Sequence, residues 1–192
     1  MSSTNRGGER RSNAAYYTPD ALARVLVASL DIPAPRLVLE PHVGEGAFMR
    51  AVRTRWPEAG LWANDIALVG ATVRGTDGAT SLDFLAFTRV SPLNWEVNLI
   101  LGNPPYTNAE AHVRKALERV EPGGHVAFLL RLAFLESKAR VPFWQEFPAK
   151  KVSVLAERPS FTGGATDSCA YGWFLWEKGR VGKTELEVLS WK

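Results

Sequence analysis

The chain has 192 residues, of which 46% are hydrophobic and 22% are charged, a composition typical of one globular domain. A net charge of only +3 excludes a strongly basic nucleic-acid coat protein, and a single cysteine excludes a disulfide within the chain. No cluster of cysteine and histidine has metal-ligand spacing, so we predict no metal site. The start of the chain lacks the apolar core of a signal peptide, and the longest apolar run, 126–135, is too short to span a membrane. We therefore expect a cytoplasmic protein without membrane contact.

The first 15 residues include arginines but show no apolar periodicity. We interpret residues 1–15 as a flexible basic arm, and a terminus without function is the alternative. Residues 16–192 then form a single domain. Its first predicted element is a helix that begins at Thr18-Pro19-Asp20, where a capping hydroxyl, a proline and an acid follow one another, and that ends within 31–35.

Short apolar segments and helical patterns alternate through the rest of the chain. The segments predicted as strands are 37–39, 61–63, 71–73, 97–101, 125–130, 151–155, 169–176 and 184–191. The predicted helices cover 47–56, 108–120 and part of 134–147, with a short helical or turn segment at 81–87 and a helix stop at 122–124. This alternation predicts an α/β fold with a mostly parallel sheet and helices on both faces, and the last two strands suggest an antiparallel edge.

The first predicted strand leads into Glu40-Pro41-His42-Val43-Gly44-Glu45-Gly46, whose two glycines let the backbone turn sharply beside a ligand. Asp65 follows Gly46 by 19 residues, at the end of the next strand, where an acid typically accepts hydrogen bonds from ribose hydroxyls. The loop lacks the third glycine of a dinucleotide fingerprint and the lysine of a phosphate loop, and its two glutamates would repel a pyrophosphate. S-adenosylmethionine, which carries a sulfonium and an ammonium, fits this loop better.

Asp83-Phe84 comes 18 residues after Asp65. A carboxylate here can accept a hydrogen bond from an adenine amino group while the ring packs on the base. The alternative is a helix cap followed by a core phenylalanine, because aspartate is a favoured cap. In order with the glycine loop and Asp65, we interpret the pair as part of the same cofactor site.

Residues 99–106 read Leu-Ile-Leu-Gly-Asn-Pro-Pro-Tyr, an apolar strand that ends in an amide, two prolines and an aromatic ring. Asn103 offers a side-chain carbonyl, and Pro104 and Pro105 lack N–H groups, so this turn presents mostly acceptors. Tyr106 offers a ring on which a base can stack. A plain turn is the alternative, but the carboxyl end of a strand is where ligands bind in open α/β sheets, which favours a site for an exocyclic amine.

Together these motifs resemble the N6-adenine methyltransferases of the Asn-Pro-Pro-Tyr type. Tyr16-Tyr17-Thr18-Pro19 is similar to the family's N-terminal cofactor motif, and Arg158-Pro159-Ser160-Phe161 to its late motif. The resemblance covers about residues 16 to 178 and implies a Rossmann-like class I methyltransferase fold with a seven-stranded sheet. It also implies S-adenosylmethionine as cofactor, with contacts from Tyr17, Thr18, Glu40, His42, Gly44, Gly46, Asp65, Ile66, Asp83, Phe84, Asn103 and Pro105.

The activity that the resemblance implies is methyl transfer to the N6 amine of adenine in DNA, at a catalytic turn formed by Asn103, Pro104, Pro105 and Tyr106. Acceptors on both amine protons, from the Asn103 side chain and the Pro104 carbonyl, would favour a pyramidal nitrogen. The base must be turned out of a duplex, and Tyr106 and Phe161 would clamp it. Candidate phosphate contacts are Arg114, Lys115, Arg119, Lys138, Arg140, Lys150 and Lys151.

Two features depart from the family's pattern. His42 is large for a glycine loop, and we interpret it as a hydrogen-bonded loop histidine rather than a catalytic group. Nothing resembles a separate target-recognition domain, which suggests a protein partner that supplies recognition. The alternatives are adenine methylation in RNA, methylation of a protein glutamine amide, and a non-catalytic partner subunit.

Overall fold

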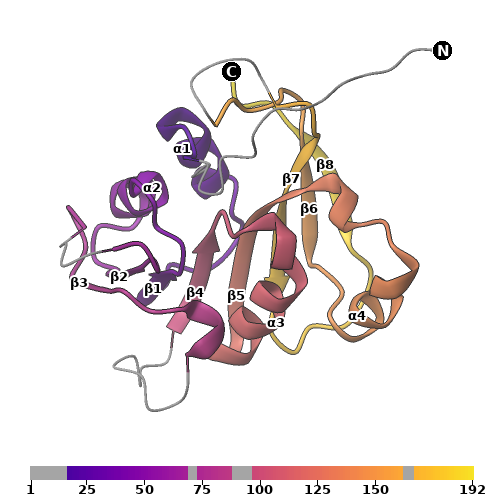
Figure 1. Cartoon of the computed structure of the whole chain (residues 1–192), viewed down its shortest axis with the longest axis horizontal. Coiled ribbons are helices and arrows are strands. Elements are labelled where there is room, and N and C mark those ends of the chain that lie inside the picture. The colour runs from indigo at the N-terminus through magenta and orange to yellow at the C-terminus, as the bar shows by residue number, and fades with distance from the viewer. Residues whose placement is uncertain (1–16, 69–72, 88–96, 162–166) are drawn as a thin grey trace.

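The computed structural model describes residues 17–68, 73–87, 97–161 and 167–192. The proposed arm, 1–15, lies outside them. The described chain forms one eight-stranded sheet with the order β3-β2-β1-β4-β5-β7-β6-β8 (Figure 1). Its strands are β1 (Leu37–Glu40), β2 (Gly60–Asn64), β3 (Gly78–Thr80), β4 (Val97–Gly102), β5 (Val120–Arg131), β6 (Lys151–Leu155), β7 (Tyr171–Glu177) and β8 (Glu185–Leu189).

Four α-helices and four short 3-10 helices connect these strands. They are α1 (Asp20–Ala28), α2 (Ala47–Arg55), η1 (Phe84–Ala86), η2 (Tyr106–Asn108), α3 (Ala109–Arg119), η3 (Leu132–Phe134), η4 (Lys138–Arg140) and α4 (Val141–Glu146) within the described residues. Helices α1 and α2 cover one face of the sheet, and α3 and α4 cover the other (Figure 1). No helix in the described part of the chain is long and apolar enough to cross a membrane.

The core follows the two-residue period of the strands. Leu99 and Leu101 of β4 pack with α1 and α2, whereas Ile100 between them packs with α3. In β5 the same alternation places Leu129 on the face covered by α1 and α2, and Phe128 on the face covered by α3 and α4. Both faces are therefore buried, which explains why these strands read as continuous apolar runs in the sequence.

The sheet confirms the predicted α/β architecture with two differences. It has eight strands rather than seven, and the antiparallel strand is not at the edge: β7 lies between β5 and β6 and runs against both. The edge strand β8 pairs in parallel with β6. The other seven strands share one direction, so their carboxyl ends lie along a single edge of the sheet.

The strand predicted at 71–73 lies mostly outside the described residues, and the structure has a strand at Gly78–Thr80 that was not predicted. Helix α3 ends before the predicted stop at 122–124, which lies inside β5, where the pairing with β4 shifts register between Val97 and Leu99. Gly123, with a φ of 75°, allows this bulge, and its N–H donates to the Lys178 carbonyl at 3.1 Å.

Candidate active site

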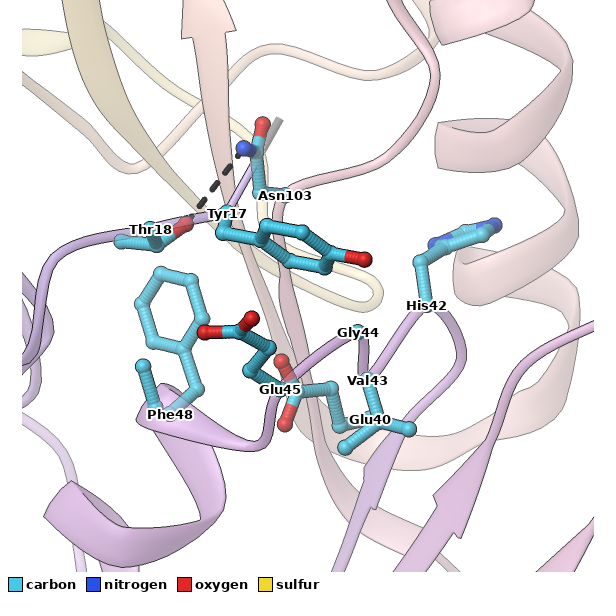
Figure 2. A pocket seen from close by; sticks show the side chains of 10 residues that line it. Tyr17, Thr18, Glu40, His42, Val43, Gly44, Glu45, Phe48 and Asn103 are labelled. Atoms are coloured by element: carbon cyan, nitrogen blue, oxygen red, sulfur yellow. Dashed lines mark hydrogen bonds between the residues drawn. The ribbon is translucent and has the colours of Figure 1, made fainter. Parts of the chain in front are cut away.

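A small pocket lies at the edge where the carboxyl ends of the parallel strands meet. It contains about 290 Å³ of space, partly open to solvent, between the segment before α1, the β1–α2 loop and the end of β4 (Figure 2). Its lining residues are Tyr17, Thr18, Glu40, His42, Val43, Gly44, Glu45, Ala47, Phe48 and Asn103. Six of the twelve predicted cofactor residues are in this set: Tyr17, Thr18, Glu40, His42, Gly44 and Asn103.

The glycine loop forms the floor of the pocket. Gly44 and Gly46 have φ of 48° and 78°, which other residues rarely adopt, and Gly46 is the N-cap of α2. A Cβ on Gly44 would lie 3.2 Å from a ring carbon of Tyr17, so the ring packs directly on the loop backbone (Figure 2). The Gly44 N–H donates to Asp65 Oδ2 at 3.0 Å, which ties the loop to the end of β2. The contacts of the Gly44 backbone with the Asp65 and Tyr17 side chains therefore fix the conformation of the loop.

Glu40 is the buried carboxyl group of the site, with 2% of its surface exposed. The Met49 N–H donates a hydrogen bond to its carboxylate, but Oε2 has no partner among the described residues. Burial raises the pKa of Glu40 well above its ordinary value, and the nearby Asp65 carboxylate adds to the increase. The Arg50 guanidinium lowers this pKa only slightly, and no described cation pairs directly with the carboxyl group, so the pocket is suited to a cationic ligand group.

Asn103 follows β4 and faces the pocket opposite the glycine loop. Its Nδ2 lies 3.4 Å from Thr18 Oγ1, and its Oδ1 accepts a hydrogen bond from the Tyr106 hydroxyl at 2.7 Å. Thr18 was expected to cap the first helix, but the N-cap is Pro19, without a side-chain cap bond. The Thr18 hydroxyl instead contacts Asn103, which brings the N-terminal motif and the Asn-Pro-Pro-Tyr turn together.

Asn64, which the sequence analysis did not single out, supports the loops beside the pocket. It is fully buried at the end of β2, and its Nδ2 donates to the carbonyls of Pro41 at 3.1 Å and Leu82 at 3.0 Å. Its Oδ1 accepts from Thr80 Oγ1 at 2.8 Å and from the Leu82 N–H at 3.1 Å. One side chain thus joins the loops after β1 and β3. Its only sequence signal is its place directly before Asp65.

The second half of the predicted cofactor site does not line this pocket. Asp83 is exposed and caps η1 by accepting from the Leu85 N–H at 2.9 Å, and Phe84 is 2% exposed in the core. This is the geometry of the alternative interpretation, a helix cap followed by a core phenylalanine. Ile66, by contrast, is 71% exposed. Asp65 remains near the pocket through its bond to Gly44.

His42 is not the hydrogen-bonded loop histidine that we expected. Neither ring nitrogen has a partner in the described part of the chain, and the ring packs edge-on against Phe84 at 5.7 Å and against His112 at 4.5 Å. Burial, with a smaller contribution from His112, lowers the pKa of His42 to about 3, so the ring is neutral. Figure 2 shows His42 turned away from the other lining side chains, so it forms a wall of the site.

The predicted base clamp involves a third aromatic residue. Phe161 is 6% exposed and packs edge-on against Tyr171 with ring centroids 5.2 Å apart, and Tyr171 packs against Tyr106 at 5.5 Å. Tyr171 therefore contacts both predicted clamp residues. Burial raises the pKa of Tyr106 above its ordinary range and that of Tyr171 to about 12, so both hydroxyls stay protonated near neutral pH. Tyr171 was missed because β7 reads as a plain aromatic core strand.

The candidate phosphate contacts do not gather at the site. Arg114 pairs with Glu110 and Glu146, whereas Lys115 pairs with Glu118. Lys150 and Lys151 lie at the amino end of β6, on the opposite edge of the sheet, and pair with Glu177 and Glu187. Arg119 ends α3 at that edge as well. Lys138 and Arg140 are the two that follow the carboxyl end of β5.

Comparisons with known proteins agree with the observed fold. No protein-family model matches the chain, and no curated protein sequence matches it. A protein from Listeria monocytogenes described as a class I S-adenosylmethionine-dependent methyltransferase is 16% identical with a TM-score of 0.68, over 91% of this chain and 65% of that one. An Agrobacterium tumefaciens protein described as an O-methyltransferase is 18% identical with a TM-score of 0.60, over 88% of this chain and 85% of that one.

A modification subunit of a type I restriction enzyme from Vibrio vulnificus is 17% identical with a TM-score of 0.67, over 92% of this chain and 47% of that one. The chain thus spans less than two thirds of the first and third of these structures. At such identities the likeness concerns the fold alone: the chain has the class I methyltransferase fold. Because proteins described with different substrates share it, the substrate must be argued from the site.

Proposed function

We propose that this protein transfers a methyl group from S-adenosylmethionine to the N6 amine of adenine in DNA. The observation that carries the proposal is the position of Asn103, whose side chain lines the same pocket as the buried carboxyl of Glu40. A residue that can accept from an amine and a residue that can pair with a cation therefore line one small pocket. The modification subunit among the structural neighbours supports DNA as the substrate.

The residues of the pocket fit the proposed cofactor. Glu40 offers Oε2, which has no partner among the described residues, to a positive group, and Gly44 adds no side chain of its own to the pocket. Tyr17, 43% exposed, offers a ring beside the loop. When bound, S-adenosylmethionine supplies a methyl group made electrophilic by its sulfonium. Asp65, Ile66, Asp83 and Phe84 stay assigned to its adenosine part by resemblance, with Asp65 the nearest to the observed pocket.

The chain's own residues orient the amine. The Asn103 side-chain carbonyl and the Pro104 carbonyl accept its two protons, which directs the nitrogen lone pair away from the ring and toward the cofactor side. In the present structure the Tyr106 hydroxyl donates a hydrogen bond to Asn103 Oδ1. When the amine binds, this hydrogen bond must break, or Oδ1 must accept from both groups. The Tyr106 ring and Phe161 stack on the extruded base. Tyr171, which contacts both rings, holds them in place or lies beside the base as well.

Recognition of a DNA sequence is assigned to a second protein. We infer that residues 16–192 form a catalytic domain and that a partner supplies the target contacts, because the predicted basic side chains are mostly paired with acids or lie at the far edge. RNA adenine and a protein glutamine amide remain the alternative substrates, since each presents a planar NH2 group to the same acceptors. A non-catalytic partner subunit is the fourth alternative.

The test compares two asparagines of the same turn. Asn103→Ala should keep cofactor binding within a few-fold, measured by calorimetry, and lose methyl transfer to DNA by about a thousandfold, as when a positioned acceptor is removed. Asn108→Ala is the matched control, because Asn108 is exposed and its side chain caps nothing. Near-normal transfer in the Asn103 variant would overturn the assigned role.

A further inference from the structure

Arg131 lies at the end of β5, beside the turn that carries Asn103. Its guanidinium carbon is 4.8 Å from the centroid of the Tyr106 ring, over the ring, within the range of cation–π attraction. Its Nε donates to the Tyr171 hydroxyl at 3.4 Å, and its Nη2 is 4.0 Å from Asp167 Oδ2. The Tyr171 hydroxyl donates to that same carboxylate oxygen at 2.7 Å. Arg131 therefore covers Tyr106 while a tyrosine–aspartate pair restrains it.

The contacts of Arg131 with the tyrosine–aspartate pair are long. Its one hydrogen bond to a described residue is long, and neither Nη nitrogen donates within the described part of the chain. Its side chain is 37% exposed. Arg53 is a useful contrast, because its guanidinium donates to three backbone carbonyls and to Asp77. A guanidinium has five N–H donors in a planar fork, and most of those of Arg131 are available to a ligand.

The Arg131 guanidinium lies over one face of the Tyr106 ring. Tyr171, which also contacts this ring, is 1% exposed and belongs to the core, and the Tyr106 hydroxyl is directed at Asn103. A planar group that stacks on the face under the guanidinium must therefore displace Arg131. An arginine that stacks on an aromatic ring is itself planar, so it occupies the place that a base would take.

We propose that Arg131 is a positioning residue for the substrate nucleotide. In the free protein Arg131 lies over the Tyr106 ring. When adenine takes that place, Arg131 leaves the ring and binds a backbone phosphate of the nucleotide. This inference rests on the proposed function. A nucleotide turned out of a strand carries its phosphates with it, and a guanidinium binds phosphate oxygens through paired, charge-assisted hydrogen bonds. The exchange keeps Tyr106 covered when no base is present and adds a strong contact when one is.

The test is the salt dependence of DNA binding. The full chain, with S-adenosylhomocysteine, is titrated with a single-stranded mixed-sequence DNA of about 20 nucleotides, long enough to fill a typical binding site. Arg131→Gln should weaken binding about tenfold at low salt, as expected for one lost charge-assisted contact. The slope of log affinity against log salt should fall in magnitude by about 0.7, the value for one phosphate contact on a single strand.

Two variants separate the charge of Arg131 from its shape and position. Arg131→Lys keeps a positive group that can still bind a phosphate, so the salt slope should stay that of the wild type although the stacked plane is lost. Arg36→Gln removes the same charge from the opposite edge of the sheet, where the Arg36 side chain is 75% exposed, and should leave slope and affinity unchanged. Arg131→Met serves as a second uncharged variant if the glutamine variant does not fold.

Kinetics supply a second readout that a merely structural role would not reproduce. A phosphate contact that contributes the same binding free energy in the ground state and the transition state does not affect kcat. Its removal should therefore raise KM for DNA and leave kcat nearly unchanged. An unchanged salt slope in Arg131→Gln, with methyl transfer by the wild type intact, would overturn this inference alone. A wild-type chain that neither binds nor methylates DNA would overturn the proposed function and this inference with it.

Discussion

At each edge of the sheet, a polar asparagine joins neighbouring segments and a glutamate lies close by. The two edges differ in the hydrogen-bond partners of the glutamate. At the amino-end edge, Asn98 accepts from the N–H groups of Arg36 and Leu37 at 2.8 and 2.9 Å. The neighbouring Glu121 accepts from Asn98 on one oxygen and from Arg36 on the other. Every oxygen of that glutamate has a partner from the chain itself.

At the carboxyl-end edge, Asn64 joins two loops in the same way, but Glu40 keeps one carboxylate oxygen without a partner in the described residues. The positive φ at Gly44 and Gly46 also lies on this edge. The difference between the edges supports the proposed ligand site at the carboxyl-end edge: the chain itself satisfies both oxygens of Glu121, whereas Glu40 would be completed by a cation of the proposed cofactor.

The largest expected effect is on cofactor affinity. Glu40→Gln should weaken S-adenosylmethionine binding by at least about a hundredfold, because removal of one partner of a buried charge pair costs roughly 3–5 kcal/mol. Isothermal calorimetry measures this, with Glu121→Gln as the matched control, whose affinity should stay within about twofold because its ion pair is partly exposed. Equal losses in both variants would remove the distinction between the two edges.

The same pair of variants gives a pH test. The pKa of Glu40 is raised in the folded protein, so between its ordinary value of 4.5 and that raised value the folded state holds a proton that the unfolded state has released. Stability of the free protein must therefore fall as pH rises through this window, whereas cofactor affinity must rise as the carboxylate forms. Urea denaturation at several pH values should show a flatter profile for Glu40→Gln, and an unchanged profile would contradict the assignment.

The next effect concerns the two asparagines. Asn64→Ala removes a fully buried amide and with it the side-chain partners of the Pro41 carbonyl and of the Leu82 backbone, so we expect a loss of about 2–3 kcal/mol in the free energy of unfolding. Cofactor affinity should fall as well, because the Pro41 carbonyl lies in the loop that forms the pocket. Asn98→Ala should also destabilise the protein but leave affinity unchanged. A variant of Asn64 that loses stability without losing affinity would show that the loops do not depend on this side chain.

A smaller effect is expected at the glycine loop. Gly44→Ala forces a side chain into a left-handed conformation, at about 1–2 kcal/mol, and pushes its Cβ against Tyr17. We expect about tenfold weaker cofactor binding. Gly75→Ala is the control, since Gly75 has a φ of 85° with nothing within 4 Å of the added Cβ, so it should show the strain without the loss of affinity. Thermal unfolding and calorimetry together separate the two contributions.

The smallest effect is at Tyr106. Tyr106→Phe keeps the ring for stacking and frees Asn103 Oδ1 from the hydroxyl, so methyl transfer should stay within about threefold of wild type, less than one neutral hydrogen bond usually contributes. Steady-state kinetics with DNA decides this. A loss of two or more orders of magnitude would give the hydroxyl a direct part in the reaction.

The sequence predicted the features that depend on local pattern. The apolar runs of β1, β4 and β5 and the helical spacing of α2 and α3 mark the fold because burial follows the strand and helix periods. The strand at Gly78–Thr80 was missed because it is short and only half-buried. The insertion of β7 between β5 and β6 could not be read from chain order, since it depends on pairing between segments far apart in sequence.

Part of the pocket lining could be predicted from the sequence, but the contacts between its residues could not. The glycine loop and the Asn-Pro-Pro-Tyr turn can be recognised from their residue types. The contacts of Thr18 with Asn103 and of Asn64 with two loops form only when the chain folds, so the sequence does not show them. Arg131 gave no signal at all. It is one of many arginines in the sequence, and only the arrangement of β4, β5 and β7 places it on Tyr106.

The measurement that tests the account most directly is identification of the methylated product. The purified chain is incubated with methyl-labelled S-adenosylmethionine and, in separate reactions, with DNA, RNA and a protein extract, and the products are digested and separated. The account predicts label in N6-methyldeoxyadenosine from DNA, and none from DNA with Asn103→Ala. Label only in RNA or in protein glutamine, or the same DNA product from the Asn103 variant, would contradict it.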